Sequence, residues 1–150
     1  MKQRKSIGRL ISCIHRNTHI YLHHELDKYN LGSGQLHFLI LLYNKDGVNQ
    51  ETLAETIKID KATCARAIKK LMDQGFITRK KDVHDKRSYK ICLTTKAIEL
   101  KPTIRSILKN STKELLNGFT KEEEILFFEF LERISKNAMT LTKTGVTNNG

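Results

Sequence analysis

The sequence has no tryptophan, one proline and three cysteines among its 150 residues. An odd and sparse set of cysteines argues against a disulfide framework and fits a reducing compartment, so we expect a cytoplasmic protein. No run of about 18 apolar residues occurs, and we therefore expect no membrane-spanning helix and no membrane partner. The basic N-terminus is not followed by an uninterrupted apolar segment, which argues against a secretory signal.

Motifs for catalysis are also missing from the sequence. It contains no glycine-rich phosphate loop and no nucleophile motif. Asp82 and Asp85 fall on an expected exposed hairpin tip, which is a poor place for acid–base chemistry. We therefore expect a protein that is not an enzyme and that requires no cofactor and no metal.

Positive charge is what the chain has in excess. Its apolar fraction of 39% and charged fraction of 29% are typical of globular proteins, and its length suits a single domain, residues 1–150. The 27 Lys and Arg residues outnumber the 16 Asp and Glu residues, which gives a formal net charge of +11. Such an excess makes a polyanion the expected partner.

Apolar residues recur at three- and four-residue steps in the first part of the chain, which predicts helices. The first helix is expected at residues 7–29 and is broken by residues 31–34. Ser33 can cap a second helix, which is apolar over residues 36–43 and should be nearly fully buried.

Two shorter helical patterns and a change of period follow. Asn49 and Asp60 can each cap a short helix, and Gly75 comes just past the end of the second. The apolar period then changes from about 3.6 to 2 residues, which predicts two strands within residues 76–94. Residues 82–88 are polar and form the tip of this hairpin.

The remainder of the chain is expected to be helical. Pro102 removes a backbone donor and should kink the helix that follows the hairpin. Thr120 and Glu123 form a capping-box pattern before the last helix. That helix is apolar in nearly every direction over residues 125–134, so we expect a partner chain to cover it. The polar tail at residues 140–150 is expected to be flexible.

Most of the excess charge lies in about a fifth of the chain. Residues 58–90 contain eleven basic and four acidic residues, a net charge of +7. A surface that is merely soluble would mix its signs more evenly. The helix and hairpin of this segment therefore become the candidate polyanion-binding elements.

The helix that begins near Lys61 sorts its residues onto two faces when they are placed at about 100° intervals. The apolar face holds Cys64, Ala67, Ile68 and Leu71. The opposite face holds Ala62, Thr63, Arg66, Lys69 and Lys70. Small residues followed by Arg and Lys suit a helix that enters a major groove, with Thr63 and Arg66 at base edges. A solvated basic face is the alternative for an isolated helix, but the adjacent charged hairpin favours nucleic acid.

Two ordered motifs extend this interpretation. The first runs through Thr52-Leu53-Ala54, Asp60-Lys61-Ala62-Thr63, Arg66, Lys70-Leu71, Gly75-Phe76-Ile77 and Arg79. The second is Asp82, Asp85-Lys86-Arg87-Ser88 and Leu93-Thr94. Together they resemble the winged helix-turn-helix of the MarR family of bacterial and archaeal transcription regulators, and the second motif looks like its wing.

The resemblance implies a mainly α fold with a small two- to three-stranded β-hairpin wing (α+β). A DNA-binding lobe would span residues 33–97, and helices within residues 5–30 and 98–139 would interleave in a homodimer. Two departures from the family pattern stand out. Ala97 occupies a position where the family usually has glycine, and Pro102 is expected to change the spacing of the DNA-binding lobes.

The resemblance also implies roles for individual residues on double-stranded DNA. Arg87 would enter a minor groove, and Asp85 would help to hold the shape of the wing. Phosphate contacts are expected from Lys61, Lys69, Lys70 and Lys86. The full set of expected DNA-binding residues is Lys61, Ala62, Thr63, Arg66, Lys69, Lys70, Lys86, Arg87 and Ser88.

The function that follows is a sequence-specific transcription regulator, with repression as the expected sign. The homodimer would bind a pseudo-palindromic operator with half-sites roughly 10 bp apart. A non-specific architectural nucleic-acid-binding protein, or an RNA-binding winged helix, is the alternative from another class.

The signal that such a regulator would sense has several interpretations. A small aromatic or anionic effector, common in the family, would bind near His15, His19, Phe38 and Tyr43. The series His15, His19 and His23 has the i, i+4 spacing of a metal site, although polar histidines at a dimer edge explain it more simply. Cys13 invites a redox interpretation, but its apolar neighbours suit a small buried residue.

Overall fold

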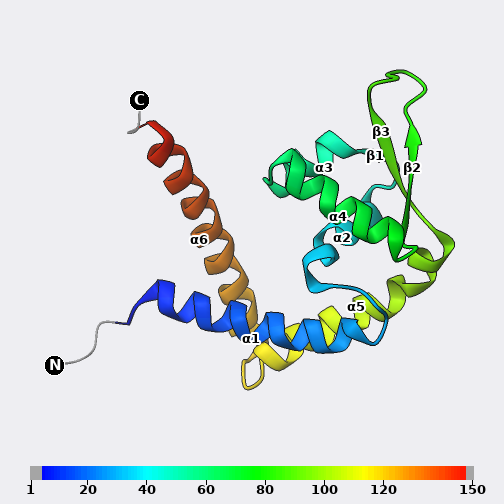
Figure 1. Ribbon diagram of the computed structural model, residues 1–150. Helices are drawn as coiled ribbons and strands as arrows, with labels where there is room; N and C mark the ends of the chain where they lie inside the picture. Colours follow the sequence, from blue (N-terminus) through cyan, green and yellow to red (C-terminus); the bar gives the residue numbers. More distant parts are fainter. Residues whose placement is uncertain (1–4, 148–150) are drawn as a thin grey trace. The chain divides into compact units, whose positions relative to one another are not determined.

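The computed structural model describes residues 5–147, with side chains through Lys143. The chain divides into two compact units, residues 1–111 and 112–150, and the boundary falls within helix α5 (Figure 1). In chain order the elements are α1 (Ile7–Asp27), the 3-10 turn η1 (Ser33–Gln35), α2 (Leu36–Asn44), β1 (Val48–Asn49), α3 (Gln50–Ile57), α4 (Lys61–Asp73), β2 (Ile77–Lys81), β3 (Tyr89–Leu93), α5 (Thr95–Leu115) and α6 (Lys121–Thr147).

The sheet of the first unit has three antiparallel strands in the order β1, β3, β2. Ile91 at the middle of β3 lies opposite Val48 of β1 and Arg79 of β2, and it has no exposed surface. The longer pair, β2 and β3, forms a hairpin that projects beyond the helices of this unit in Figure 1. The expectation of a mainly α fold with a small β-hairpin wing is confirmed.

The helix ends that position the hairpin and α4 follow from local chemistry. The side chain of Asn49 accepts a hydrogen bond from the backbone N–H of Glu51 at 2.8 Å and caps α3. Asp60 accepts from the N–H of Thr63 at 2.8 Å and caps α4. Gly75 follows α4 with φ +79°, a left-handed conformation that favours glycine. All three sequence predictions are confirmed.

One hydrophobic core joins the helices of the first unit to the sheet. Its fully buried members come from every part of the unit: Leu26, Leu31, Leu39, Leu42, Leu53, Cys64, Ile68, Leu71, Phe76, Ile91 and Ile104. Helices α1 and α5 lie side by side in Figure 1, and the amide of Asn110 donates to the hydroxyl of Tyr21 at 3.0 Å. Burying this many large side chains fixes α4 and the hairpin to one body.

The two departures from the family pattern are accommodated within α5. Ala97 has no exposed surface, and its carbonyl accepts from the hydroxyl of Tyr43 at 2.7 Å. Since Ala97 has ordinary helical backbone, the absence of glycine there imposes no strain. Pro102 is exposed inside α5, which continues from Thr95 to Leu115. The proline therefore does not end the helix, because water can hydrate the carbonyl that lost its donor.

One local expectation is wrong. Ser33 does not cap the second helix; it begins the 3-10 turn η1, and its hydroxyl lies 3.1 Å from Nε2 of His19 instead. Helix α6 extends as far as Thr147, residues 148–150 lie outside the described part, and flexibility of residues 140–150 stays a prediction. Extending an existing helix costs far less than starting one, which explains why α6 continues through this polar segment.

The second unit consists of the end of α5, a turn and α6. Thr120 and Glu123 form the expected capping box, with hydrogen bonds of 2.8 and 3.1 Å. Large apolar side chains of α6 nevertheless remain exposed: Ile125, Leu126, Phe128, Phe130, Leu131, Ile134 and Met139. Across the described residues, none of the helices combines the length and apolarity needed to span a bilayer.

Candidate nucleic-acid interface

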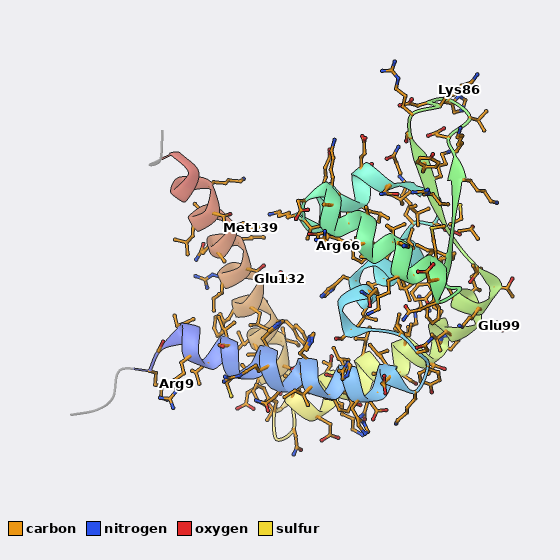
Figure 2. All side chains as sticks on the ribbon, in the orientation of Figure 1. Arg9, Arg66, Lys86, Glu99, Glu132 and Met139 are labelled. Atoms are coloured by element: carbon orange, nitrogen blue, oxygen red, sulfur yellow. The ribbon has the colours of Figure 1, made fainter. Side chains whose placement is uncertain are left out.

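Helix α4 presents the two faces that its sequence predicts. Cys64, Ile68 and Leu71 are at most 1% exposed and dock the helix on the core. The opposite side is open to solvent and carries Lys61, Ala62, Arg66, Lys69 and Lys70, with Thr63 half-buried. Figure 2 shows Arg66 on this helix and Lys86 at the far end of the hairpin. The unit thus offers two separate basic projections.

A short chain of hydrogen bonds organises the first turn of α4. The hydroxyl of Thr63 donates to Oδ2 of Asp60 at 2.7 Å, and Nη2 of Arg66 donates to the same hydroxyl at 3.1 Å. The hydroxyl and backbone N–H of Thr63 stabilise the ionised carboxylate, so they lower the pKa of Asp60. Asp60 therefore orients Thr63, and Thr63 in turn orients the guanidinium of Arg66.

Local turns shape the tip of the hairpin. Oδ1 of Asp85 accepts from the backbone N–H of Arg87 at 3.0 Å, and Oδ1 of Asp82 accepts from that of His84 at 2.9 Å. Asp85 is the residue for which the sequence predicts a wing-shaping role. Both carboxylates thus accept from backbone N–H groups of the turn, and the side chains of Lys86 and Arg87 are exposed at the same tip.

Ser88 does not occupy the place that the sequence predicts for a DNA contact. Ser88 is only 7% exposed, and its hydroxyl accepts a hydrogen bond from the side-chain amide of Asn49. A direct contact through this side chain is therefore wrong for the structure described. The reason is tertiary: Asn49 lies 39 residues away in the chain, so the pairing has no signature in the local pattern.

Two further aromatic and basic residues belong to the hairpin. The guanidinium of Arg79 lies 4.3 Å from the ring centroid of Tyr89, across the β2–β3 pair. Such a stack holds the Arg side chain against the strand while leaving its charge available. Arg79 is part of the first sequence motif, but the sequence predicts no role for either side chain, because their stacking depends on the pairing of β2 with β3.

A small hollow separates the hairpin from α3 and α4. It has a volume of about 210 Å³, and three of its lining residues, Lys61, Arg79 and Arg87, are cationic. Cys64 also lines it and lies 3.8 Å from the carbonyl of Gln50, and burial raises the pKa of its thiol. A raised pKa keeps the thiol protonated, which argues against an activated cysteine.

The four residues proposed for an effector pocket do not together line any one of the hollows described for residues 5–147. Phe38 is buried and lines a hollow of about 440 Å³ beside α4, whose described lining includes none of the other three. Tyr43 is bonded to Ala97 instead, and burial raises its pKa to about 12. His15 and His19 are exposed on α1 with their ring centroids 5.9 Å apart.

The alternative sensors have the following surroundings. Cys13 is exposed on α1 of the single chain, with the amide of Asn17 3.5 Å from its sulfur. Nε2 of His19 lies beside Ser33, as described above. In the described part of the chain, no three His, Cys, Asp or Glu residues are grouped to hold a metal ion.

Comparisons with known proteins agree with this geometry. The family model described as MarR family matches residues 31–89. The chain is similar to the HTH-type transcriptional regulator YybA of Bacillus subtilis, with 41% identity over 113 residues that cover 75% of each protein. It is also similar to the crystal structure of a MarR transcriptional regulator from Methanosarcina mazei, with a TM-score of 0.85, 38% identity and coverage of 90% of this chain and 97% of that one.

A structural neighbour solved with nucleic acid gives a further comparison. A MarR family regulator from Listeria monocytogenes, crystallised with a 26-mer DNA, has a TM-score of 0.80 and 32% identity, and the match covers 89% of both chains. The helix-turn-helix, the three-stranded wing and these similarities converge on one assignment. The chain belongs to the MarR family of winged helix-turn-helix transcriptional regulators.

Proposed function

We propose that this regulator binds a pseudo-palindromic operator as a homodimer and represses transcription in the cytoplasm. The observation on which the proposal chiefly depends is the organised first turn of α4, where Asp60 and Thr63 orient Arg66 on an exposed basic face. Arg66 is suited to a guanine edge, because its planar fork matches the O6 and N7 acceptors. Lys69 and Lys70, further along the helix, suit phosphates.

The hairpin supplies the second DNA contact in this proposal. Arg87 is exposed at its tip, where it would enter the minor groove next to the half-site that α4 reads. Lys86 beside it would contact phosphate, as would Lys61 at the start of α4. The DNA complex of the Listeria relative supports duplex DNA as the partner.

Exposed apolar side chains support the dimer. On α1, Ile7, Leu10, Ile11 and Ile14 are each about half exposed or more. On α6, Phe128 and Phe130 are 47% and 51% exposed. Large apolar side chains exposed in this number along two helices favour an interaction surface. We assign residues 5–30 and 98–139 to dimerisation and residues 33–97 to DNA binding.

Release by a small effector is a separate part of the proposal. The hollow beside α4 has an apolar floor that includes Phe38 and Ile57, and its rim includes Arg66 and Lys70. An aromatic anion bound there would occupy two cations that we assign to DNA. Titrating a panel of phenolic acids into the protein–DNA complex tests this step, and unchanged affinity across the panel would remove it.

Two substitutions on α4 test the DNA-binding proposal. Operator duplexes are first selected by the wild-type protein from a randomised library. Arg66→Ala should then weaken binding by about 1–3 kcal/mol and relax base preference, because it removes a base contact. Lys70→Ala should weaken all sequences nearly equally and reduce the salt slope by about one, because it removes a phosphate contact.

The control is Lys109→Ala, an exposed lysine on α5, which should leave both quantities unchanged. Enrichment of a pseudo-palindrome supports a specific regulator. Binding without any sequence preference would favour a non-specific architectural protein. Preference for RNA over DNA would favour an RNA-binding winged helix. If Arg66→Ala left affinity and preference intact, the proposed placement of α4 would be wrong.

A further inference from the structure

Asn49 makes two hydrogen bonds that join different parts of the DNA-binding lobe. Its Oδ1 accepts from the backbone N–H of Glu51 and so caps α3. Its Nδ2 donates to the hydroxyl of Ser88, the residue that precedes strand β3. One side chain thus links the start of the helix-turn-helix to the base of the wing tip.

Few other bonds hold the wing tip to this body. Strand β1 pairs with β3 at two positions, Val48 with Ile91 and Asn49 with Lys90. The β2–β3 ladder ends where Lys81 lies opposite Tyr89. Beyond that pair the described hydrogen bonds of residues 82–88 stay inside the hairpin, except the bond from Asn49 to Ser88.

The backbone of Ser88 is hydrogen-bonded to two residues of the wing tip. Its N–H donates to the carbonyl of Asp85, and its carbonyl accepts from the N–H of Asp82, both at 3.0 Å. Asp85 in turn receives the N–H of Arg87. A fixed Ser88 therefore sets the direction of the turn from which Arg87 projects.

The tip of the wing, beyond the buried residues of the strands, has room to shift if this bond is broken. The hollow of about 210 Å³ lies beside Asn49 and Ser88 and gives the hairpin room to shift relative to α4. Lys61 borders it from α4, and Arg79 and Arg87 border it from the wing. Glu51 of α3 also lines the hollow, so the charges around it are mixed and do not by themselves fix the position of the wing tip.

We propose that Asn49 and Ser88 are positioning residues for DNA recognition, which act by holding Arg87 at a fixed place relative to Arg66. The inference rests on the proposed DNA-binding function and adds a determinant of specificity that touches no DNA. Arg87 would bind at the flanks of each half-site. The base preference there would therefore depend on the hydrogen bond between Asn49 and Ser88 at the base of the wing tip.

Two single substitutions break the bond from opposite sides. Ser88→Ala removes the hydroxyl and leaves the backbone bonds of the tip and the cap of α3 in place. Asn49→Ser keeps a good capping residue for α3, but its side chain is too short to reach Ser88. Ser106→Ala, an exposed serine on α5, is the matched control.

The measurement uses a duplex selected by the wild-type protein from a randomised library. Both substitutions should weaken binding roughly two- to tenfold, the range expected for one hydrogen bond. The loss of base preference should be confined to the flanking positions. In the Arg87→Ala background, Ser88→Ala should cause no further loss, because the residue that it positions is gone. A merely structural role would not produce this pattern.

Several outcomes would overturn the inference. Unchanged affinity in Ser88→Ala would do so, and so would an equal loss with and without Arg87. If circular dichroism shows that Ser88→Ala is unfolded, the affinity of Asn49→Ser, measured with and without Arg87, decides instead. A wild-type protein that enriches no sequence removes the proposed function itself, whereas a wild-type consensus with unaffected variants removes the positioning role alone.

Discussion

Asp60 shows how one side chain can both begin a helix and arrange the groups beside it. Its two carboxylate oxygens bind the N–H and the hydroxyl of Thr63, and the hydroxyl receives Arg66. An Asp at this position is a good N-cap, and its negative charge suits the positive end of the helix dipole. The same residue therefore belongs to the fold and to the candidate interface.

The lowered pKa of Asp60 predicts a dependence of stability on acid. Its folded-state pKa lies below the ordinary value of 3.8, so the ionised carboxylate stabilises the fold above that pH. This contribution is lost as the pH falls through the folded-state pKa. Asp60→Asn keeps a capping oxygen but cannot titrate, so its thermal midpoint should fall less steeply between neutral pH and about pH 3.

The pH series for Asp60→Asn needs the wild-type protein as its reference at each pH. Some acid dependence should persist in the variant, because Lys28 and His24 also lower the pKa of Glu25. At neutral pH the variant should have the lower midpoint, because asparagine still caps α4 but lacks the charge and the second oxygen that binds the Thr63 hydroxyl, and the two midpoints should converge in acid. Parallel curves over the acidic range would show that Asp60 is not the titrating group.

At the scale of elements, α4 is held by a narrow buried stripe. Leu71 has no exposed surface, whereas the adjacent Met72 is 37% exposed. Leu71→Ala should lower the free energy of unfolding by about 2–5 kcal/mol, because it leaves a cavity in the core. Met72→Ala should cost clearly less. The two variants are compared by urea unfolding at one fixed protein concentration, since the stability of a dimer depends on concentration. Equal losses of unfolding free energy in the two variants would contradict the buried stripe.

Elements with strong local signals could be predicted from the sequence. The caps at Asn49 and Asp60 and the stop at Gly75 depend on neighbouring residues, and all three are present. Strand β1 has only two residues, too few to show a period of 2, so the sequence does not predict it. Ser33 has the chemistry of a cap, but its hydroxyl pairs with His19 from another helix.

In the candidate interface, too, the sequence predicts what depends on neighbouring residues and misses what depends on distant contacts. The exposure of Arg66 follows from the helical period, which any single helix displays. The burial of Ser88 depends on a contact with Asn49 across 39 positions, and the bond between Thr63 and Arg66 depends on rotamers. Periodicity places a residue on a face, whereas the partner that it meets there is decided by tertiary packing.

For the whole molecule, charge and apolar surface are separated along the chain. The net charge of +7 lies in residues 58–90, whereas the exposed apolar side chains named above lie outside that segment, on α1 and α6. A regulator that reads two half-sites needs both kinds of surface. Under the proposed function, the basic face would bind one half-site, and the apolar surface would set the distance to the next.

Ile134→Glu tests the dependence of DNA binding on the dimer. Ile134 is 41% exposed on α6, and a buried unpaired carboxylate at a dimer interface is strongly unfavourable. Sedimentation should show a shift toward monomer, and affinity for the selected duplex should fall about tenfold or more, because two linked half-site contacts become independent. Lys136→Gln changes the net charge by the same amount on the polar side of α6, as Ile134 and Lys136 are about 200° apart on a helix. If both variants stayed dimeric, or if a monomeric Ile134→Glu bound as tightly as the wild type, the assignment of α6 to dimerisation would fail.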